Sequence, residues 1–176
     1  MATINSTVQQ WLQDAREAPE EFWARAANGL PWFRKWDSVF ERDDPSFRWF
    51  VGAQTNIAYN CLDHHVANGR GDNTALIYVN ELGERRQFTY IEFLAEVERV
   101  AAGLRALGIG KGDCLTIYMP TSPEAIMAML ATVRIGAIHS VVFAGFGAGA
   151  LAERIKASDS KVVLTADIGY RKGAEV

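Results

Sequence analysis

From about residue 70 onward, apolar and polar positions form short regular segments that predict strands and helices. The run at 74–79, rich in β-branched residues, and the run at 85–90 are separated by residues 80–84, which include Gly83. Two such runs joined by a short glycine-containing turn are typical of a β-hairpin. We therefore predict a hairpin formed by these two runs.

A helix is predicted directly after this hairpin. Thr89 and Glu92 have the spacing of a capping box, in which the hydroxyl accepts from a backbone N–H three residues on and the glutamate reaches back. Gly108 marks the end of the helix, because glycine readily adopts the left-handed conformation that closes helices. The apolar stripe of this helix, at i, i+3 and i+4 spacing, consists of Leu94, Val97, Ala101 and Leu104.

Beyond residue 113, strands and helices alternate. Strands are predicted at 114–119, 137–143 and 161–166, and helices at 123–135 and 150–158. This order predicts right-handed βαβ crossovers and a parallel sheet, so the fold class is α/β. The run at 137–143 is almost continuously apolar, and we expect that strand to be buried on both faces.

The first 50 residues have a different character. They hold all five tryptophans of the chain, whereas fourteen of its fifteen glycines come later. Pro19, the acidic residues after it and Gly29 predict a short helix. Residues 30–50 lack a sustained period, and we expect a loop and a short helix there, in a Trp-rich helical and irregular arm that buries large rings on the body of the protein. An independent N-terminal helical domain is the alternative.

Composition limits the classes of function. The 176 residues are 49% hydrophobic and 22% charged, with a formal net charge of −3 and two cysteines. These values exclude a disordered chain and a disulfide scaffold, and they give no electrostatic reason to expect nucleic acid. There is no basic N-terminal region followed by an apolar stretch, and no apolar run reaches the roughly 20 residues of a membrane span. We expect a cytoplasmic protein with no nucleic-acid or membrane partner.

Two glycine-containing segments are candidate ligand loops. A phosphate-binding loop follows a strand, so that the next helix points its N-terminus at the anion. Residues 108–113 instead follow a helix and precede a strand, which predicts a helix end and an αβ turn. Residues 144–149, which include Ala144 and Gly145, do follow a strand and precede a helix. They lie where doubly wound sheets bind ligands, and both a ligand loop and a plain flexible turn fit this position.

Cationic and metal-binding candidates are fewer. The segment Tyr170-Arg171-Lys172-Gly173 follows the last strand, where adjacent cations can bind a phosphate, although a solvated basic turn is the more ordinary interpretation. Cys61, His64 and His65 are too few for a four-ligand zinc site, and we predict a helix with ordinary histidines there. We find no catalytic constellation.

Several motifs occur in order across nearly the whole chain. They are Trp32-Phe33, Trp36-Asp37, Trp49-Phe50-Val51-Gly52, Tyr59-Asn60-Cys61-Leu62-Asp63-His64-His65-Val66, Phe88-Thr89-Tyr90, Gly112-Asp113, Ile117-Tyr118-Met119-Pro120, Pro123-Glu124-Ala125 and Arg134-Ile135-Gly136-Ala137-Ile138-His139-Ser140-Val141-Val142-Phe143. With these motifs the chain resembles the N-terminal region of AMP-forming acetyl-CoA synthetases, which belong to the acyl-adenylate-forming superfamily. Propionyl-CoA synthetases, separate or as the ligase portion of fused synthases, share these motifs.

The resemblance implies a two-step ligase reaction. A short carboxylate, acetate or propionate, reacts with ATP to give an acyl-adenylate and pyrophosphate, with Mg²⁺ assisting, and the thiol of CoA then displaces AMP. ATP, CoA and Mg²⁺ are therefore implied for the complete enzyme. We expect no cofactor to be tightly bound to this chain alone.

The resemblance also implies part of a CoA site, without catalytic or metal-binding residues. Ala144 and Gly145 match a turn near the pantetheine of CoA. The segment from Gly169 matches a G-x-R-x-G-R motif that contacts the CoA nucleotide phosphate, with Arg171 as its first arginine. Ala174 replaces the second arginine, and we expect Lys172 to compensate as a point charge. The residues implied in this second segment are Tyr170, Arg171, Lys172, Gly173 and Ala174.

By this resemblance, residues 1–66 form an N-terminal arm and residues 67–176 form the first part of the AMP-binding domain. The family's ATP loop, acyl pocket and catalytic lysine correspond to positions after residue 176, so we expect an N-terminal portion that is inactive alone. Its open sheet edge is expected to support a homodimer. The alternative is a free-standing, non-catalytic binding or interaction module with the same fold, and the sequence of the continuing reading frame distinguishes the two.

Overall fold

A computed structural model of the chain describes residues 5–171 and 174–175. The chain forms two compact units, Met1–Thr55 and Asn56–Val176. None of the helices in the described residues has both the length and the apolar character that a membrane span needs.

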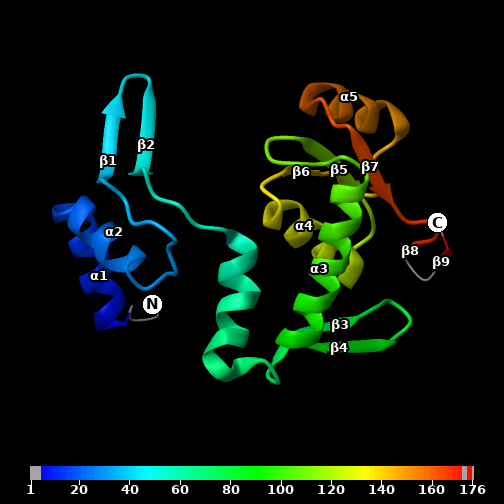
Figure 1. Cartoon of the computed structure of the whole chain (residues 1–176), viewed down its shortest axis with the longest axis horizontal. Coiled ribbons are helices and arrows are strands. Elements are labelled where there is room, and N and C mark those ends of the chain that lie inside the picture. Colours follow the sequence, from blue (N-terminus) through cyan, green and yellow to red (C-terminus); the bar gives the residue numbers. More distant parts are fainter. Residues whose placement is uncertain (1–4, 172–173, 176) are drawn as a thin grey trace. The chain divides into compact units, whose positions relative to one another are not determined.

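The first unit begins with two helices, α1 (Ser6–Glu17) and α2 (Pro19–Ala27) (Figure 1). Asn5 caps α1, since its Oδ1 accepts from the backbone N–H of Thr7 at 2.8 Å. α2 begins at Pro19 and confirms the predicted helix. α1 has no counterpart among the predicted elements, although its apolar residues have helical spacing.

The expectation of a loop and a short helix over residues 30–50 is wrong. β1 (Ser38–Asp43) and β2 (Ser46–Val51) pair there as an antiparallel hairpin. Phe40 lies opposite Trp49, and their ring centroids are 4.7 Å apart. Such cross-strand aromatic pairs stabilise a hairpin, but the paired positions are too far apart in the sequence to produce a local period.

Aromatic rings supply much of the packing inside the first unit. The rings of Trp11 and Phe22 meet edge-on with their centroids 6.0 Å apart, and those of Trp23 and Trp49 meet in the same way with their centroids 6.2 Å apart. Among the described hydrophobic residues of this unit, only Phe22 and Ala27 are buried. Aromatic pairs of this kind contribute about 0.5–1.5 kcal/mol each beyond their buried area, so ring pairs rather than a closed aliphatic core hold these elements together.

The second unit opens with a helix over residues 57–70 whose hydrogen bonding is largely of the π type, in η1 (Tyr59–Asp63) and η2 (Val66–Arg70). A kink lies at Gly69, where φ is 74°, a conformation that favours glycine. This confirms the helix predicted around the cysteine and the two adjacent histidines.

β3 (Thr74–Val79) and β4 (Arg85–Thr89) form the predicted hairpin, and α3 (Tyr90–Ala106) follows it. Both hydrogen bonds of the capping box are present. The N–H of Glu92 donates to Thr89 Oγ1 at 3.3 Å, and the N–H of Thr89 donates to Glu92 Oε2 at 2.8 Å. The predicted start of this helix is therefore confirmed.

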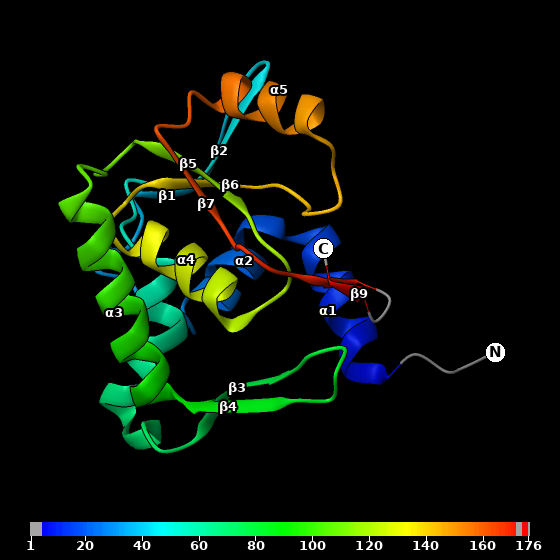
Figure 2. The same cartoon turned by 90° about the vertical axis from the view of Figure 1, so that its right-hand side faces the viewer.

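Three short strands make a parallel sheet in the order β6 (Ile138–Val141), β5 (Cys114–Tyr118) and β7 (Val162–Thr165). α4 (Pro123–Arg134) connects β5 to β6, and α5 (Ala148–Ser158) connects β6 to β7. The two crossovers move in opposite directions along the sheet, and crossovers of the same hand then place α4 and α5 on opposite faces, as Figure 2 shows. The α/β class is confirmed.

The expectation that β6 is buried on both faces is wrong. Ile138 is 57% exposed and Val141 is 50% exposed. Within the described part of the chain β6 pairs with β5 alone, so it is an edge strand, whereas Leu115 and Ile117 of the central β5 are buried. A homodimer through such an edge stays a prediction.

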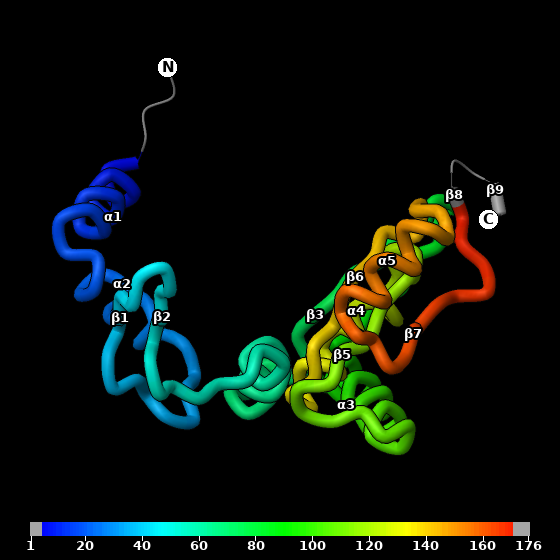
Figure 3. The backbone as a smooth tube through the Cα atoms, turned by 90° about the horizontal axis from the view of Figure 1, so that it is seen from above, coloured from blue at the N-terminus to red at the C-terminus, as the bar shows by residue number. Residues whose placement is uncertain are grey.

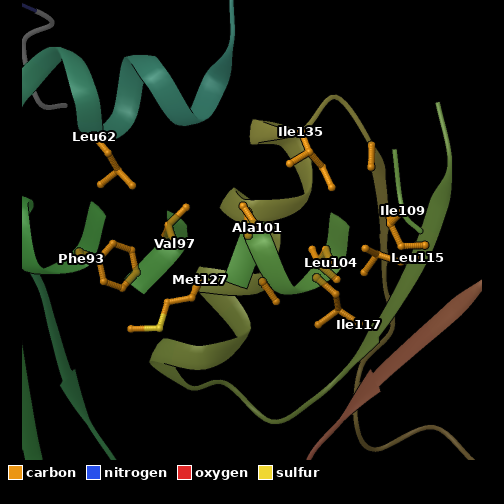
Figure 4. Packing of buried hydrophobic residues seen from close by; sticks show 13 residues of the cluster. Leu62, Phe93, Val97, Ala101, Leu104, Ile109, Leu115, Ile117, Met127 and Ile135 are labelled. Carbon is orange, nitrogen blue, oxygen red and sulfur yellow. The ribbon is translucent and has the colours of Figure 1, made fainter. Parts of the chain in front are cut away.

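The core of the second unit lies where α3, α4 and the sheet meet (Figure 4). Leu62 of η1 points toward Phe93 and Val97 of α3 and so attaches the π-helical segment to this core. The buried cluster consists of Leu62, Phe93, Val97, Ala101, Leu104, Ile109, Leu115, Ile117, Met127, Ala128, Ala131, Ile135 and Ala137.

A charged triad joins three helices beside this core. Arg134, at the end of α4, donates two hydrogen bonds to Asp63 of η1, at 2.6 and 2.9 Å, and a third to Glu98 of α3 at 2.7 Å. The Arg134 and Asp63 side chains are only 23% and 22% exposed. This bidentate pair is therefore less screened by water than the ion pairs on the surface.

We predict that Asp63→Asn lowers the free energy of unfolding by roughly 1–3 kcal/mol, because it removes the charge from a partly buried bidentate pair and leaves the guanidinium undercompensated. Urea unfolding followed by circular dichroism measures this loss. The matched control is Glu96→Gln, which breaks an exposed pair with Arg99 on α3 and should cost less than about 0.5 kcal/mol. Equal losses in the two variants would contradict the assigned role of the triad.

Candidate functional site

The carboxyl ends of the parallel strands form the candidate functional edge of the second unit. β5, β6 and β7 end at Tyr118, Val141 and Thr165. Ligands of doubly wound sheets bind outside these strand ends. Residues 142–147, which we call the β6–α5 turn, leave from this edge, and so does the segment 166–171 that follows β7.

The β6–α5 turn is attached to β5 at two successive residues. The N–H of Val142 donates to the carbonyl oxygen of Ile117 at 2.9 Å. The hydroxyl of Tyr118 lies 2.9 Å from the carbonyl oxygen of Ala144 and 2.7 Å from that of Phe146, and it donates to both. The turn therefore starts at a buried residue, Val142, and is held further along by one phenol.

Both predicted residues of this turn are placed beside accessible backbone. Ala144 is half-buried and Gly145 is exposed. A Cβ atom at Gly147 or Gly149 would meet no other atom within 4 Å, so crowding does not require glycine there. No side chain caps the N-terminus of α5, which begins at Ala148. Uncapped N–H groups at a helix N-terminus favour a negative partner.

An aromatic and cationic cluster surrounds the exposed part of the turn. Phe143 and Phe146 are 62% and 40% exposed and meet edge-to-face at 5.8 Å. The guanidinium of Arg154, from α5, lies 4.6 Å from the ring centroid of Phe146. Flat apolar rings next to a cation and open backbone suit a ligand that combines apolar and anionic parts.

The second predicted segment follows β7, as the tube in Figure 3 shows. Tyr170 and Arg171 form the short strand β8 (Tyr170–Arg171), which pairs antiparallel with β9 (Ala174–Glu175). Tyr170 is 43% exposed. Lys172 and Gly173 lie outside the described residues.

The two predicted segments leave the sheet at the same edge. Ala144 and Gly145 follow β6, and Tyr170 and Arg171 follow β7, with β5 between the two strands. This placement depends on the strand order. A role for these residues in binding is a proposal that the geometry leaves room for.

The 108–113 segment lies at the opposite, amino-terminal edge of the sheet. Gly108 and Gly112 have φ values of 84° and 86°, which favour glycine. Asp113 accepts from the N–H of Gly110 at 2.8 Å and from Lys161, just before β7, at 2.7 Å. These contacts confirm the predicted αβ turn, with its carboxylate already paired.

Cys61, His64 and His65 lie on the π-helical segment. Nδ1 of His64 is 3.2 Å from Nδ2 of Asn68, and the His65 ring packs against Tyr90 at 4.6 Å. Burial raises the pKa of the Cys61 thiol. Among the described residues, no group of three or more His, Cys, Asp or Glu side chains is placed to hold a metal ion.

A groove of about 280 Å³ lies between β4, α3 and the start of α4. Phe88, Val100 and Met127 supply its apolar lining. Its two arginines are both paired, Arg86 with Glu124 at 2.6 Å and Arg99 with Glu96. Its charges are therefore matched within the chain, and no feature of the groove selects a ligand.

Sequence reasoning gives no site role to Arg154, and none to Tyr118 either, although Tyr118 lies in one of the motifs that carry the resemblance. Tyr118 is the last residue of a buried strand, directly before Met119-Pro120. A side chain with a hydroxyl group at the carboxyl end of such a strand indicates a candidate site residue, because ligands bind at this edge of the sheet. Arg154 carries no comparable signal, because its contact with Phe146 depends on how α5 packs.

Two family models match the chain. The model described as "AMP-binding enzyme" matches residues 63–175, and the model described as "Acetyl-coenzyme A synthetase N-terminus" matches residues 8–61. Together they cover both units.

Individual relatives agree with these models. An acetyl-coenzyme A synthetase of Deinococcus radiodurans is 51% identical over 160 residues, which are 91% of this chain and 25% of that protein. A 3-hydroxypropionyl-coenzyme A synthetase of Metallosphaera sedula is 48% identical over 163 residues, 92% of this chain and 25% of that protein. The solved acetoacetyl-CoA synthetase from Streptomyces lividans matches with a TM-score of 0.86 and 31% identity, covering 93% of this chain and 25% of that one. The chain spans about a quarter of the length of these relatives.

We predict a pH-dependent contribution of Asp113 to stability. Its hydrogen bond from Lys161 and that from the N–H of Gly110 hold the pKa of this carboxyl below its usual value. A lowered folded pKa means that the stabilisation is present above the unfolded pKa of about 4 and is lost as the pH falls through the folded pKa. The stability difference between the wild type and Asp113→Asn should therefore be constant from about pH 5 to pH 8 and shrink below about pH 4.

Unfolding free energies from urea titrations at several pH values measure this difference. In Lys161→Met, the carboxyl of Asp113 should titrate at higher pH than in the wild type, because the first of its two partners is gone. A stability difference that does not change between pH 2.5 and pH 7 would overturn the prediction.

Proposed function

The chain belongs to the AMP-binding enzyme family, and on that premise we propose that it is part of an acyl-CoA synthetase for a short carboxylate. The supporting observation is that CoA synthetases match this chain over 91% and 92% of its length, with 51% and 48% sequence identity. The chain spans only a quarter of those proteins, so the activity of the complete enzyme is the proposal, and this chain supplies a portion of it.

The proposed reaction has two steps. A carboxylate oxygen attacks the α-phosphorus of ATP, the bond to the bridging oxygen breaks, and acyl-AMP and pyrophosphate form. The sulfur of CoA, as thiolate, then attacks the acyl carbonyl carbon, the bond to the AMP oxygen breaks, and acyl-CoA and AMP form. The net products are acyl-CoA, AMP and pyrophosphate.

This chain's part in the proposal is one side of the CoA site. The β6–α5 turn would lie along the pantetheine, since Gly145 exposes its backbone and glycine allows close approach. The segment at the CoA nucleotide, where a cation pairs with a phosphate, would consist of Tyr170, Arg171, Lys172, Gly173 and Ala174. Mg²⁺ would neutralise charge on the ATP phosphates. The described residues bring together no set of ligands for it, and we assign none to this chain.

The relatives do not determine which acyl group the complete enzyme would transfer. Proteins named for acetyl and for 3-hydroxypropionyl transfer are 51% and 48% identical to the chain over almost the same length. Sequence identity over this quarter of the relatives therefore does not distinguish their acyl substrates. Acetate, propionate and 3-hydroxypropionate are all to be tested. A cytoplasmic location also stays a prediction.

We predict that the full-length protein catalyses ATP–pyrophosphate exchange that depends on acetate, propionate or 3-hydroxypropionate and then forms the matching acyl-CoA. The 176-residue chain alone should catalyse no exchange, because the resemblance places the ATP loop and catalytic lysine after residue 176. Exchange of labelled pyrophosphate into ATP measures both. Absence of carboxylate-dependent exchange in the full-length protein would refute the function, and clear turnover by the chain alone would refute its dependence on the rest.

Arg171→Ala in the full-length protein should raise the KM for CoA about tenfold, the effect of losing one charge-assisted hydrogen bond to a phosphate. Adenylation should be unchanged, since the exchange reaction takes place before CoA binds. The matched control is Arg105→Ala at the exposed end of α3, near the opposite edge of the sheet. An equal loss in both half-reactions would contradict the proposed role of Arg171.

A further inference from the structure

We propose that Tyr118 is a positioning residue for CoA, which holds the β6–α5 turn in its binding conformation through its hydroxyl. This inference rests on the proposed function for the identity of the ligand. The geometry that carries it is the pair of hydrogen bonds from one phenol to the carbonyl oxygens of Ala144 and Phe146.

The two acceptors lie on either side of Gly145. A phenol has a single proton, so the 2.9 and 2.7 Å contacts share it or alternate. The carbonyl of Ala144 belongs to the peptide group before Gly145, and the carbonyl of Phe146 belongs to the peptide group that leads into Gly147. One oxygen atom on a rigid ring thereby fixes two peptide planes around the most conformationally free residue of the turn.

The position of Tyr118 makes its hydroxyl a fixed point. Tyr118 is the last residue of the central strand and lies in register with Thr165 of β7. The preceding Ile117 is buried and accepts from the N–H of Val142. The strand that is most firmly held in the sheet therefore provides both the backbone anchor at the start of the turn and the side-chain anchor in its middle.

The rest of the turn offers little burial to hold it. Gly145 and Phe146 are exposed, and a Cβ at Gly147 would meet open space. Besides the phenol, this part of the turn is held by two backbone hydrogen bonds, from the N–H of Phe146 to the carbonyl oxygen of Phe143 at 3.0 Å and from the N–H of Leu151 to that of Gly147 at 3.2 Å. The Phe146 ring also contacts the Phe143 ring and the guanidinium of Arg154. Because Gly145 is exposed, the phenol of Tyr118 can hold the turn from the protein side while the backbone of Gly145 stays accessible to a ligand. Preorganisation of this kind lowers the ordering cost of binding.

The test is Tyr118→Phe, which removes the hydroxyl and keeps the ring. In the full-length protein the KM for CoA should rise about three- to tenfold, as expected for the loss of a neutral hydrogen bond. The KM for ATP, the KM for the carboxylate and the rate of pyrophosphate exchange should stay unchanged. Tyr78→Phe is the matched control, because Tyr78 lies in β3, which pairs with β4 and not with the parallel sheet, and it should leave every constant unchanged.

Hydrogen exchange separates the two ideas on which this proposal depends. In the 176-residue chain, the amides of residues 145–147 should exchange faster in Tyr118→Phe than in the wild type, whatever the ligand is. Unchanged exchange there, or an unchanged KM for CoA in an active enzyme, would overturn the positioning role. A full-length wild type that makes no acyl-CoA, together with faster exchange in the variant, would refute the proposed function and leave the anchoring of the turn intact.

Rescue distinguishes positioning from a general effect on folding. Tyr118→p-aminophenylalanine restores an N–H donor at the same place, so it should return the KM for CoA most of the way to the wild-type value. If Tyr118→Phe proves too unstable to assay, this variant still decides the question in comparison with Tyr118→His, whose shorter ring cannot reach the same carbonyls. Equal KM values for CoA in these two variants would refute the proposal.

Discussion

Strand β5 has a neighbouring strand on each edge and helices over each face, and the second unit is built outward from it. Leu115 and Ile117 are buried there, and parallel hydrogen bonding to β6 and β7 satisfies the backbone on both sides. The residues at the two ends of β5 are therefore held in place by the strand. Asp113, just before the strand, ties the αβ turn to Lys161, and Tyr118, at its end, ties down the β6–α5 turn.

The two edges of this sheet differ in how their glycine-containing segments are held. At the amino edge, Gly108 and Gly112 only allow a tight turn whose carboxylate is paired inside the chain. At the carboxyl edge, glycines leave backbone uncovered, and the exposed rings of Phe143 and Phe146 surround it. Two glycine-containing segments of similar composition thus have different surroundings, because parallel strands give the sheet two chemically different edges.

The first unit is stabilised in a different way. Its helices and hairpin are linked by edge-on ring contacts, such as Trp23 with Trp49, while both rings stay partly exposed. The second unit buries aliphatic side chains from α3, α4 and β5 against each other, and the partly buried pair of Arg134 and Asp63 fastens the π-helical segment beside them. A small unit with little closed core can use large rings because each ring provides much contact area.

The sequence by itself determined the features whose cause lies within a few residues. The capping box of Thr89 and Glu92, the helix that begins at Pro19, the hairpin of β3 and β4, and the α/β alternation could all be predicted from local spacing, because these interactions join near neighbours. The location of the candidate segments after β6 and β7 could be predicted for the same reason. Only the tertiary structure decided that β6 is an edge strand with exposed Ile138 and Val141, and that Tyr118 reaches a turn 26 to 28 positions away. Strand order and side-chain reach are set by packing among distant segments, and such contacts produce no period in the sequence.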